Sequence, residues 1–440
     1  MAFEQGRYAA HVGRTDRTRL SDLRRAVSAL YRDNRQQGYA AWRSTAYDFV
    51  CPSVDTYPYQ WFWDSCFHAI VLSRIDVGRA EAEIVSLLAN QQPDGFVPHM
   101  TYWQRERPVD PNAPYQVAGR SRRISDSMQP PVLAEAVAAV ARRGRGAAFL
   151  REVLPAVHRF YDWCDRVRDP DRDGLIAALE PHETGMDQTP AFDAYIGVSG
   201  SDPAHFEAAW RSIAVEHAQL GHDPAAIFAR DRFVVEEVAS NVLYAENQRV
   251  LAGSLAELDD ADGAAELRAR AERTEAALLG RCWAPGLADF CSLAGRDESP
   301  LPGSTVAGLM PILLRVLPEA IVERLAGRLA DPADFGTRYP VPSVSRGHPA
   351  YRAAPRGTVL WRGQSWINMN WYLARGLRRH GREQLASSIE DASLALVERS
   401  GFREHYNPET GVGYGARGFA WSALVLEMLS ERVEPDGSAG

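Results

Sequence analysis

Residues 147–166 read AAFLREVLPAVHRFYDWCDR, and this stretch shows most clearly how the chain folds. Its apolar side chains recur three and four residues apart, so they share one face of an α-helix. These side chains are Leu150, Val153, Leu154, Val157, Phe160, Tyr161 and Cys164. The same period predicts helices over residues 18–37, 131–143, 236–258, 263–279, 304–317, 319–329, 365–379, 383–399 and 418–431.

Helices dominate the whole pattern, and segments with the alternating period of a strand are scarce. Roughly a dozen helices without a short repeat consensus can close into a double ring, and an all-α, (α/α)6 barrel is one such fold. Its long loops gather at one end around a central pocket. No linker-like stretch interrupts the sequence, so residues 1–440 are predicted to form a single domain with a flexible tail from about residue 433.

The composition points away from several classes of protein. A net charge of −8 does not favour a nucleic-acid partner. The N-terminus lacks the apolar segment of a signal peptide and no apolar run approaches ~18 residues, so no membrane span is predicted and the cytoplasm is expected. The five cysteines lack C-x-x-C spacing, which indicates free, buried thiols. No pattern indicates an oligomeric state.

Five predicted loops combine Trp or Tyr with polar side chains and glycine, a mixture typical of sites on a rigid scaffold. They cover residues 57–68, 92–103, 180–193, 356–368 and 401–417. The first loop holds Tyr59, Trp61, Trp63 and Asp64. Tryptophan stacks on the apolar face of a sugar and a carboxylate accepts bonds from its hydroxyls, so a sugar site is predicted. The alternative is a buried aromatic cluster in which Asp64 caps the next helix.

Two of these loops carry candidate catalytic carboxyl groups. Glu183, Asp187 and Asp193 share one loop, and Glu404 lies in the other. Cleavage of a glycosidic bond needs two carboxyl groups, one of them kept protonated by apolar or like-charged surroundings. Glu183 and Asp193 are expected to supply the like charge near Asp187, although all four acids also suit ordinary loop or helix-cap positions.

A second aromatic segment extends the candidate sugar site. Trp361, Arg362 and Trp366 precede the helical stripe of residues 365–379. Arg362 suits either a structural ion pair or the positioning of a catalytic carboxylate. Gln129, just before two prolines that open a helix, is a further candidate.

An acidic segment matches the calcium loop of an EF-hand. Asp169, Asp171, Asp173 and Glu180 fit the pattern D-x-D-x-D-G-x5-E, which predicts a possible structural calcium site. The alternative is a tight acidic turn with Gly174 at positive φ, since no exiting helix is evident.

The eleven histidines have no H-E-x-x-H or H-x-H spacing, so no catalytic metal and no required cofactor are predicted. His68 is expected in the interior. His182 and His405 flank the candidate acids, where they either tune them or lie partly exposed in their loops.

The order of the motifs carries further information. Along the chain they read QWFWDS (60–65), SMQPP (127–131), ETGMDQTP (183–190), WRGQSWINMNW (361–371) and FREHYNPETGVGYG (402–415). In this order they resemble glycoside hydrolase family 63, and within it the bacterial mannosylglycerate and glucosylglycerate hydrolases. The resemblance covers about residues 57–430.

This resemblance implies an (α/α)6 barrel that hydrolyses a small α-glucoside or α-mannoside, such as glucosylglycerate or mannosylglycerate, with inversion. It implies Asp187 as the general acid, Glu404 as the general base and Asp64 as a partner of the sugar hydroxyls. The other residues implied at the sugar subsite are Trp63, Gln129, Trp361, Gly363 and Trp366.

Two departures leave open the aglycone, the group attached to the sugar. The family usually has proline where this chain has Gln364, which adds hydrogen-bond donors beside the sugar site. Residues 194–235 match no pattern, although in glycerate-specific members this region helps to hold the glycerate carboxylate. Candidate carboxylate partners are Arg105, Arg107, Arg122, Arg123 and Arg211.

Three alternative functions remain at this stage. One is an α-glucosidase that acts on oligosaccharides or on a glycosylated natural product. A sugar epimerase or isomerase on the same barrel would need paired histidines in the pocket. A non-catalytic sugar-binding protein would be expected to lack one of the two acids.

Overall fold

The computed structural model describes residues 2–106, 121–198, 200 and 202–434, with side chains from Asp16 onward. Within these residues the chain is mostly helical. Six elements form an inner ring in which each packs on the next and the last returns to the first. They are α2 (Phe62–Leu72), α4 (Leu133–Arg143), α9 (Val238–Ala256), the 3-10 helix η6 (Val306–Leu313), α12 (Ile367–Arg379) and α14 (Leu424–Val433).

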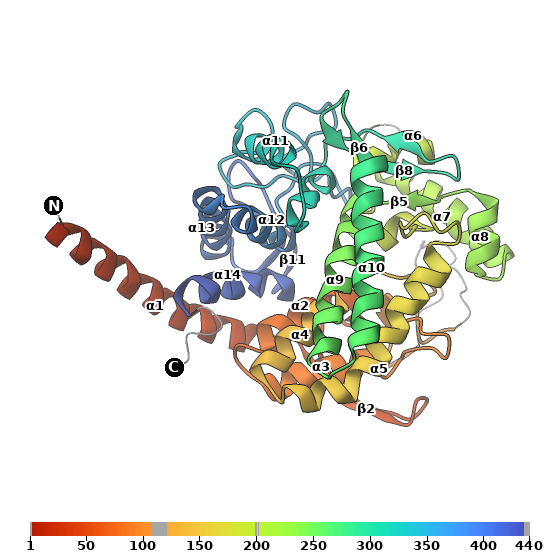
Figure 1. Ribbon diagram of the computed structural model, residues 1–440, viewed down its shortest axis with the longest axis horizontal. Coiled ribbons are helices and arrows are strands. Elements are labelled where there is room, and N and C mark those ends of the chain that lie inside the picture. The colour runs from red at the N-terminus through yellow and green to blue at the C-terminus, as the bar shows by residue number, and fades with distance from the viewer. Residues whose placement is uncertain (1, 107–120, 199, 201, 435–440) are drawn as a thin grey trace.

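An outer ring surrounds the first, because each inner element packs on one further helix (Figure 1). In the same order the outer helices are α3 (Val77–Leu88), α5 (Ala147–Trp163), α10 (Ala261–Ala277), α11 (Glu319–Ala330), α13 (Glu383–Ser400) and α1 (Ala2–Asp33). The first and last helices of the chain thus make the sixth pair, while the start of α1 projects from the barrel (Figure 1). This closed double ring is the expected (α/α)6 barrel.

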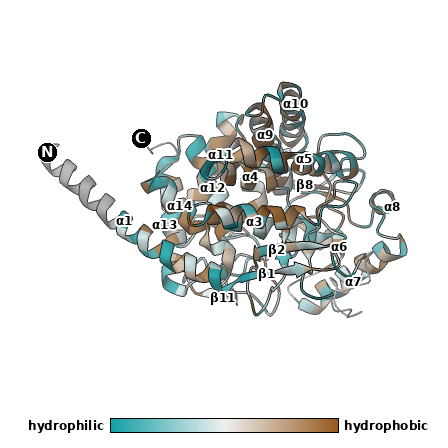
Figure 2. Cartoon of the chain, turned by 90° about the horizontal axis from the view of Figure 1, so that it is seen from below, coloured by the Kyte–Doolittle hydropathy of each residue, from teal (hydrophilic) through white to brown (hydrophobic). Residues whose placement is uncertain are grey.

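Burial explains which helices the sequence pattern predicts well. Outer helices such as α10 bury one face and expose the other, which produces a clear apolar stripe. Every residue of α2 is buried, so no polar face marks it as a helix, and neither α2 nor α3 is among the predicted elements. Hydrophobic residues accordingly gather inside the barrel (Figure 2), where one apolar cluster includes side chains from both rings.

Two predicted helices differ from the structure. The helix over 18–37 ends at Asp33, because residues 35–40 pair as a strand with residues 45–50. The segment 304–317 forms only the 3-10 helix η6, which contains Pro311. Pro311 removes a backbone donor, which disfavours a regular α-helix, although α5 accommodates Pro155 within its length.

The remaining elements lie in the connections, and all but the 17-residue helix α7 (Pro203–Gln219) are short. The strands pair antiparallel: β1 (Arg35–Ala40) with β2 (Thr45–Val50), β3 (Gln60–Trp61) with β4 (Met100–Thr101), β6 (Trp283–Ala284) with β7 (Asp289–Phe290), β10 (Arg403–Tyr406) with β11 (Gly413–Arg417), and β8 (Ser292–Ala294) with both β5 (Val235–Glu236) and β9 (Ser299–Leu301). The short helices are α6 (Asp193–Ile196), α8 (Pro224–Arg230), η2 (Cys164–Arg168), η3 (Pro181–Thr184), η4 (Pro190–Phe192), η5 (Leu278–Cys282) and η7 (Ala420–Ala423).

The helices α7 and α8 occupy the stretch that matches no sequence pattern. Each begins with an Asp-Pro pair, in which the side chain of Asp202 or Asp223 accepts a backbone N–H of the first turn. An acidic cap followed by proline is a strong start signal for a helix. These two helices lie outside the ring and cover one side of its loops (Figure 1).

All five cysteines are free and buried, as predicted. None of the helices within the described ranges is both long and apolar enough to cross a membrane. The predicted flexible tail lies almost entirely outside the described residues, since α14 continues to Val433.

Candidate active site

A pocket of about 600 Å³ opens at the end of the barrel where the inner helices α2, α4, α12 and α14 begin. Segments far apart in the sequence meet there because the N-termini of inner helices all face this end. Of the predicted site residues, the pocket brings together Trp61, Trp63, Asp64, Gln129, Asp187, Trp361, Trp366 and Glu404. The other lining residues are Pro52, Tyr57, His99, His182, Gly185, Leu360, Phe419 and Trp421.

Tryptophan rings form one wall of this pocket. Trp361 stacks on Trp366 with a centroid distance of 3.8 Å, and Trp421 meets Trp366 and Trp63 edge-on. Trp361 has a φ of 58°, a left-handed conformation that a bulky residue rarely adopts and that commonly marks a functional site. Flat indole faces in such a wall are suited to pack against the C–H face of a sugar.

Asp64 lies at the pocket with one carboxylate oxygen that has no hydrogen-bond partner among the described residues. The side chain is 3% exposed, and burial followed by the charge of Glu404 raises its pKa well above the ordinary value. Leaving a buried acceptor unpaired is costly, so the site favours a ligand that donates hydrogen bonds. Nearby, the side-chain oxygen of Gln129 accepts the Trp63 N–H, which fixes the amide at the pocket.

Asp187 lies in the loop after η3, against the aromatic wall. Burial among protein atoms raises the pKa of Asp187 to about 7, and the charge of Glu404 acts in the same direction. Gly185 makes this approach possible: its φ is 70°, and a Cβ there would lie 2.3 Å from the Trp63 ring. The loop therefore places a carboxyl group that is protonated for much of the time near neutral pH.

The predicted source of like charge for Asp187 is wrong. Glu183 forms a buried bidentate ion pair with Arg168, with both N–O distances at 2.6 Å. Asp193 forms a similar pair with Arg362, at 2.7 and 2.5 Å. Each acid is neutralised by its own guanidinium, so these pairs hold the loop in shape, and the raised pKa of Asp187 comes from burial and Glu404.

Glu404 stands on β10 with both carboxylate oxygens bonded. The Tyr57 hydroxyl donates to Oε1 at 3.1 Å, and the Ala416 N–H donates to Oε2 at 2.9 Å. Gly415 has a φ of 66°, and a Cβ there would lie 2.4 Å from Oε2. Burial raises the pKa of Glu404, while both hydrogen bonds favour the ionised form. The site thus contains two carboxyl groups with raised pKa values, and on Glu404 the hydrogen bonds from Tyr57 and Ala416 oppose the effect of burial.

Tyr57→Phe is expected to shift the acidic limb of the pH profile of kcat/KM to higher pH, because it removes a donor that stabilises the Glu404 carboxylate. Losing a hydrogen bond worth about 1 kcal/mol corresponds to a roughly three- to tenfold loss of kcat/KM on that limb. Tyr59→Phe is the matched control, since Tyr59 lies outside the pocket. An unchanged acidic limb in Tyr57→Phe would show that this bond does not tune Glu404.

Gly363 and Gln364 are predicted site residues that the structure does not bring into the pocket. The Gln364 side chain is fully buried, accepts the Arg362 N–H and donates to the Arg352 carbonyl. The Gln364 amide is therefore engaged in hydrogen bonds that stabilise the local backbone around Arg352 and Arg362. Gly363 has a φ of 137°, and a Cβ there would lie 2.8 Å from the Arg352 carbonyl. Arg362 is likewise used in its ion pair with Asp193, the structural role considered for it.

Tyr59 also lies outside the pocket. Its ring packs on Tyr102, and its hydroxyl accepts a bond from Arg105. The candidate carboxylate partners that the structure describes line neither this pocket nor the one discussed below; they are Arg105, Arg122, Arg123 and Arg211. Arg107 is outside the described residues.

Several lining residues escape prediction from sequence. Tyr57 lies four residues before the WFWD motif, and Phe419 and Trp421 lie at the start of η7, just before the last inner helix, so the only signal for them is proximity to a motif. His182 and His405 are both buried, which corrects the expectation that they lie partly exposed. The His405 ring packs against the Trp366 ring. His68 lies in the interior as predicted, with Nδ1 bonded to the Val50 carbonyl.

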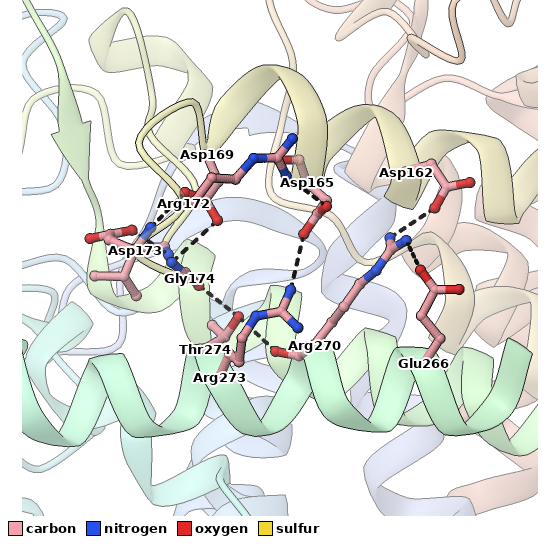
Figure 3. Close-up of polar contacts among 11 residues, drawn as sticks. Asp162, Asp165, Asp169, Arg172, Asp173, Gly174, Glu266, Arg270, Arg273 and Thr274 are labelled. Carbon is pink, nitrogen blue, oxygen red and sulfur yellow. Dashed lines mark hydrogen bonds and ion pairs between the residues drawn. The ribbon is translucent and has the colours of Figure 1, made fainter.

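Asp169, Asp171 and Asp173 each place a carboxylate oxygen within 4.8 Å of the others, and the loop around Asp169, Asp173 and Gly174 forms a tight turn (Figure 3). Asp169 accepts the backbone N–H groups of Asp173 and Gly174, and Gly174 has a φ of 96°. Glu180, the fourth predicted ligand, is not in this acidic group and lines another pocket. The expected EF-hand ligand set is therefore not formed, and calcium binding stays a prediction.

The fold and the site together define a class of enzyme. A double ring of helices with a tryptophan-lined pocket and two buried carboxyl groups is the arrangement of an (α/α)6-barrel glycoside hydrolase. The model of the mannosylglycerate hydrolase MGH1-like glycoside hydrolase domain matches residues 57–422. The chain belongs to this family of glycoside hydrolases.

Known proteins agree with this assignment over nearly the whole chain. A mannosylglycerate hydrolase of Thermus thermophilus is 32% identical over 86% of this chain and 95% of its own length. A glucosylglycerate hydrolase of Mycolicibacterium hassiacum is 28% identical over 85% and 92%. The crystal structure of a GH63 mannosylglycerate hydrolase from Thermus thermophilus in complex with glucose matches with a TM-score of 0.79 and 31% identity, over 92% of this chain and 99% of that one.

Proposed function

We propose that this enzyme hydrolyses a small α-glucoside or α-mannoside with inversion, using Asp187 as general acid and Glu404 as general base. The observation that carries the proposal is the contrast between the two carboxyl groups in one pocket. Burial raises the pKa of Asp187 to about 7, whereas on Glu404 two hydrogen-bond donors oppose the effect of burial and favour the ionised form. Two carboxyl groups kept in different protonation states are what acid–base cleavage of a glycoside requires.

In this mechanism the sugar packs against the tryptophan wall, and the unpaired oxygen of Asp64 accepts its hydroxyls. Asp187 donates its proton to the glycosidic oxygen as the bond to the anomeric carbon breaks. Glu404 takes a proton from a water molecule that attacks the opposite face of the ring. The product is therefore the free sugar with the inverted anomeric configuration.

Proton NMR of the nascent product tests this proposal most directly. Candidate substrates are glucosylglycerate, mannosylglycerate, trehalose and kojibiose, and the first two are suggested by the names of the relatives. With the two glycerate compounds, whose aglycone is not a sugar, the β-anomer is expected to form first and then to mutarotate. An α-anomer as first product would indicate retention, and the lack of any hydrolysis would reject the proposed substrate range.

The activity is expected to follow a bell-shaped pH profile. Asp187 acts in its protonated form, so with its pKa raised to about 7 the rate is expected to fall above about pH 7. Glu404 acts in its ionised form, and burial raises its pKa, so the rate also falls as pH drops toward and through that pKa. A kcat/KM profile from pH 4 to 9 checks both limbs; a rate that stays flat up to pH 9 would contradict the role of Asp187.

Membership of a hydrolase family favours hydrolysis over the epimerase and the non-catalytic binding protein considered from the sequence. An α-glucosidase acting on oligosaccharides or on a glycosylated natural product stays a second candidate, because a second pocket adjoins the active site. We also propose that the enzyme works in the cytoplasm; its five buried free thiols suit a reducing compartment.

A further inference from the structure

A second pocket, of about 800 Å³, lies between the active-site loops and the helices α7 and α8. Its lining is more polar than that of the active site and contains four histidines. The residues are His99, Met100, Tyr102, Ser125, Asp126, Ser127, Arg168, Leu179, Glu180, His182, Glu183, Trp210, Ala214, His217, His222, Pro224 and Ile227. No step of the proposed cleavage uses this pocket.

The second pocket adjoins the active site. His99 and His182 line both pockets. On the active-site side His99 meets Trp61 edge-on at 5.0 Å, and on the other side His182 meets Trp210 at 4.4 Å. Aromatic side chains therefore lie on both sides of this shared wall, and the second pocket is the space next to the sugar site that can take a group attached to the sugar.

Several buried polar atoms of this lining have no hydrogen-bond partner among the described residues. They are both ring nitrogens of His99, Nε2 of His217 and the indole N–H of Trp210. These three side chains are 3%, 6% and 8% exposed. Burial lowers the pKa of His99 to about 3 and that of His217 to about 4, so both rings are neutral and each offers a donor and an acceptor. Hydroxyl groups, which both donate and accept, match such a lining.

The charges of the pocket do not suit an anionic ligand. Arg168 is the one guanidinium among the described lining residues, and both of its terminal nitrogens bond to Glu183. Asp126 and Glu180 add carboxyl groups, and burial followed by the charge of Glu183 raises the pKa of Glu180 to about 8. Among the described lining residues a carboxylate ligand would meet acids and the neutral rings of His99 and His217, while the one guanidinium is already paired with Glu183; burying a poorly neutralised charge is costly.

We propose that the second pocket binds the aglycone, and that it selects a neutral polyhydroxylated unit, a polyol or a second sugar, over a carboxylate such as glycerate. His99, His217 and Trp210 bond its hydroxyls. This inference rests on the proposed function. The names of two relatives specify glycerate, whereas this inference assigns a neutral aglycone to this chain. Two of the three side chains that carry it, Trp210 and His217, lie on α7.

A matched pair of substrates tests the selectivity. 2-O-α-Glucosylglycerol and 2-O-α-glucosylglycerate, or the corresponding mannosides, differ only in a hydroxymethyl group against a carboxylate. The kcat/KM for the neutral compound is expected to exceed that for the acid by about tenfold or more. α-Glycosyl fluoride, whose leaving group is a single atom, reports on the sugar site alone. Equal or better use of the glycerate compound would overturn the inference.

Variants locate the selectivity in the pocket. His217→Leu and the more conservative Trp210→Phe each remove an unpartnered polar group. Each is expected to lower kcat/KM for glucosylglycerol relative to glycosyl fluoride at least fivefold. His205→Leu is the matched control, an exposed histidine on the same helix, and should leave that ratio unchanged. A ratio unchanged in Trp210→Phe would overturn the inference.

The two proposals fail in different ways. If glycosyl fluoride and all glycosides resist the wild-type enzyme, the proposed function fails. If the fluoride is cleaved but glycerate is preferred, only the aglycone inference fails. A third outcome, in which free glycerol inhibits hydrolysis of glucosylglycerol without competing with it, would identify a separate polyol site and also overturn the role in aglycone binding.

Discussion

Asp187→Asn is expected to lower kcat on an alkyl α-glycoside by about 10²- to 10⁴-fold, the usual contribution of a general acid. Asparagine keeps the shape of the side chain but cannot donate the proton that an alkoxide leaving group needs. Fluoride leaves without that proton, so α-glycosyl fluoride should retain most of its rate. The expected signature is a strong dependence on the leaving group together with loss of the alkaline limb of the pH profile.

The fold of Asp187→Asn should be unimpaired. The pKa of this acid is raised to about 7 in the folded protein, so between about pH 4 and pH 7 the folded state holds a proton that the unfolded state has released. The folding stability linked to the proton on Asp187 is thus lost as pH rises through that window. Asparagine does not ionise, so the variant does not show this loss. Thermal unfolding at pH 8 should occur at the same or a higher temperature. The exposed Asp55→Asn is the control. If Asp187→Asn lost equal activity on the fluoride and on the alkyl glycoside, that result would contradict an acid role.

Glu404→Gln is expected to lower kcat by a similar or larger factor, about 10²- to 10⁴-fold, and to do so for every leaving group. The base acts on the attacking water, so a better leaving group does not replace it. Azide needs no deprotonation, so adding it should restore turnover of glycosyl fluoride and yield the β-glycosyl azide. That product would confirm attack from the face opposite the leaving group.

The control for this variant is Glu398→Gln, at an exposed glutamate of α13 that pairs with Arg19. Full activity in Glu404→Gln would remove it from the mechanism. Recovery of the α-glycosyl azide instead of the β-anomer would indicate a covalent intermediate and a retaining enzyme.

The sequence predicted those parts of the fold that have two different faces. The stripe in residues 147–166 exists because α5 packs on the barrel with one side and meets solvent with the other. The wholly buried α2 and the proline-containing η6 lack that contrast. Neighbouring elements surround these two segments and stabilise their helical form. The sequence therefore shows no one-sided apolar stripe for them.

The sequence by itself determined the two carboxyl groups, the tryptophan motifs and the helical class, because side-chain chemistry and apolar period are local properties. Only the tertiary structure decided which acids face the pocket. Glu183 and Asp193 lie beside Asp187 in the chain but are paired with Arg168 and Arg362, which come from other segments. The second pocket is likewise a product of packing, since α7 brings Trp210 and His217 to loops more than a hundred residues earlier. Charge and polarity act through space, so the partner that neutralises an acid or completes a pocket is fixed only when the chain has folded.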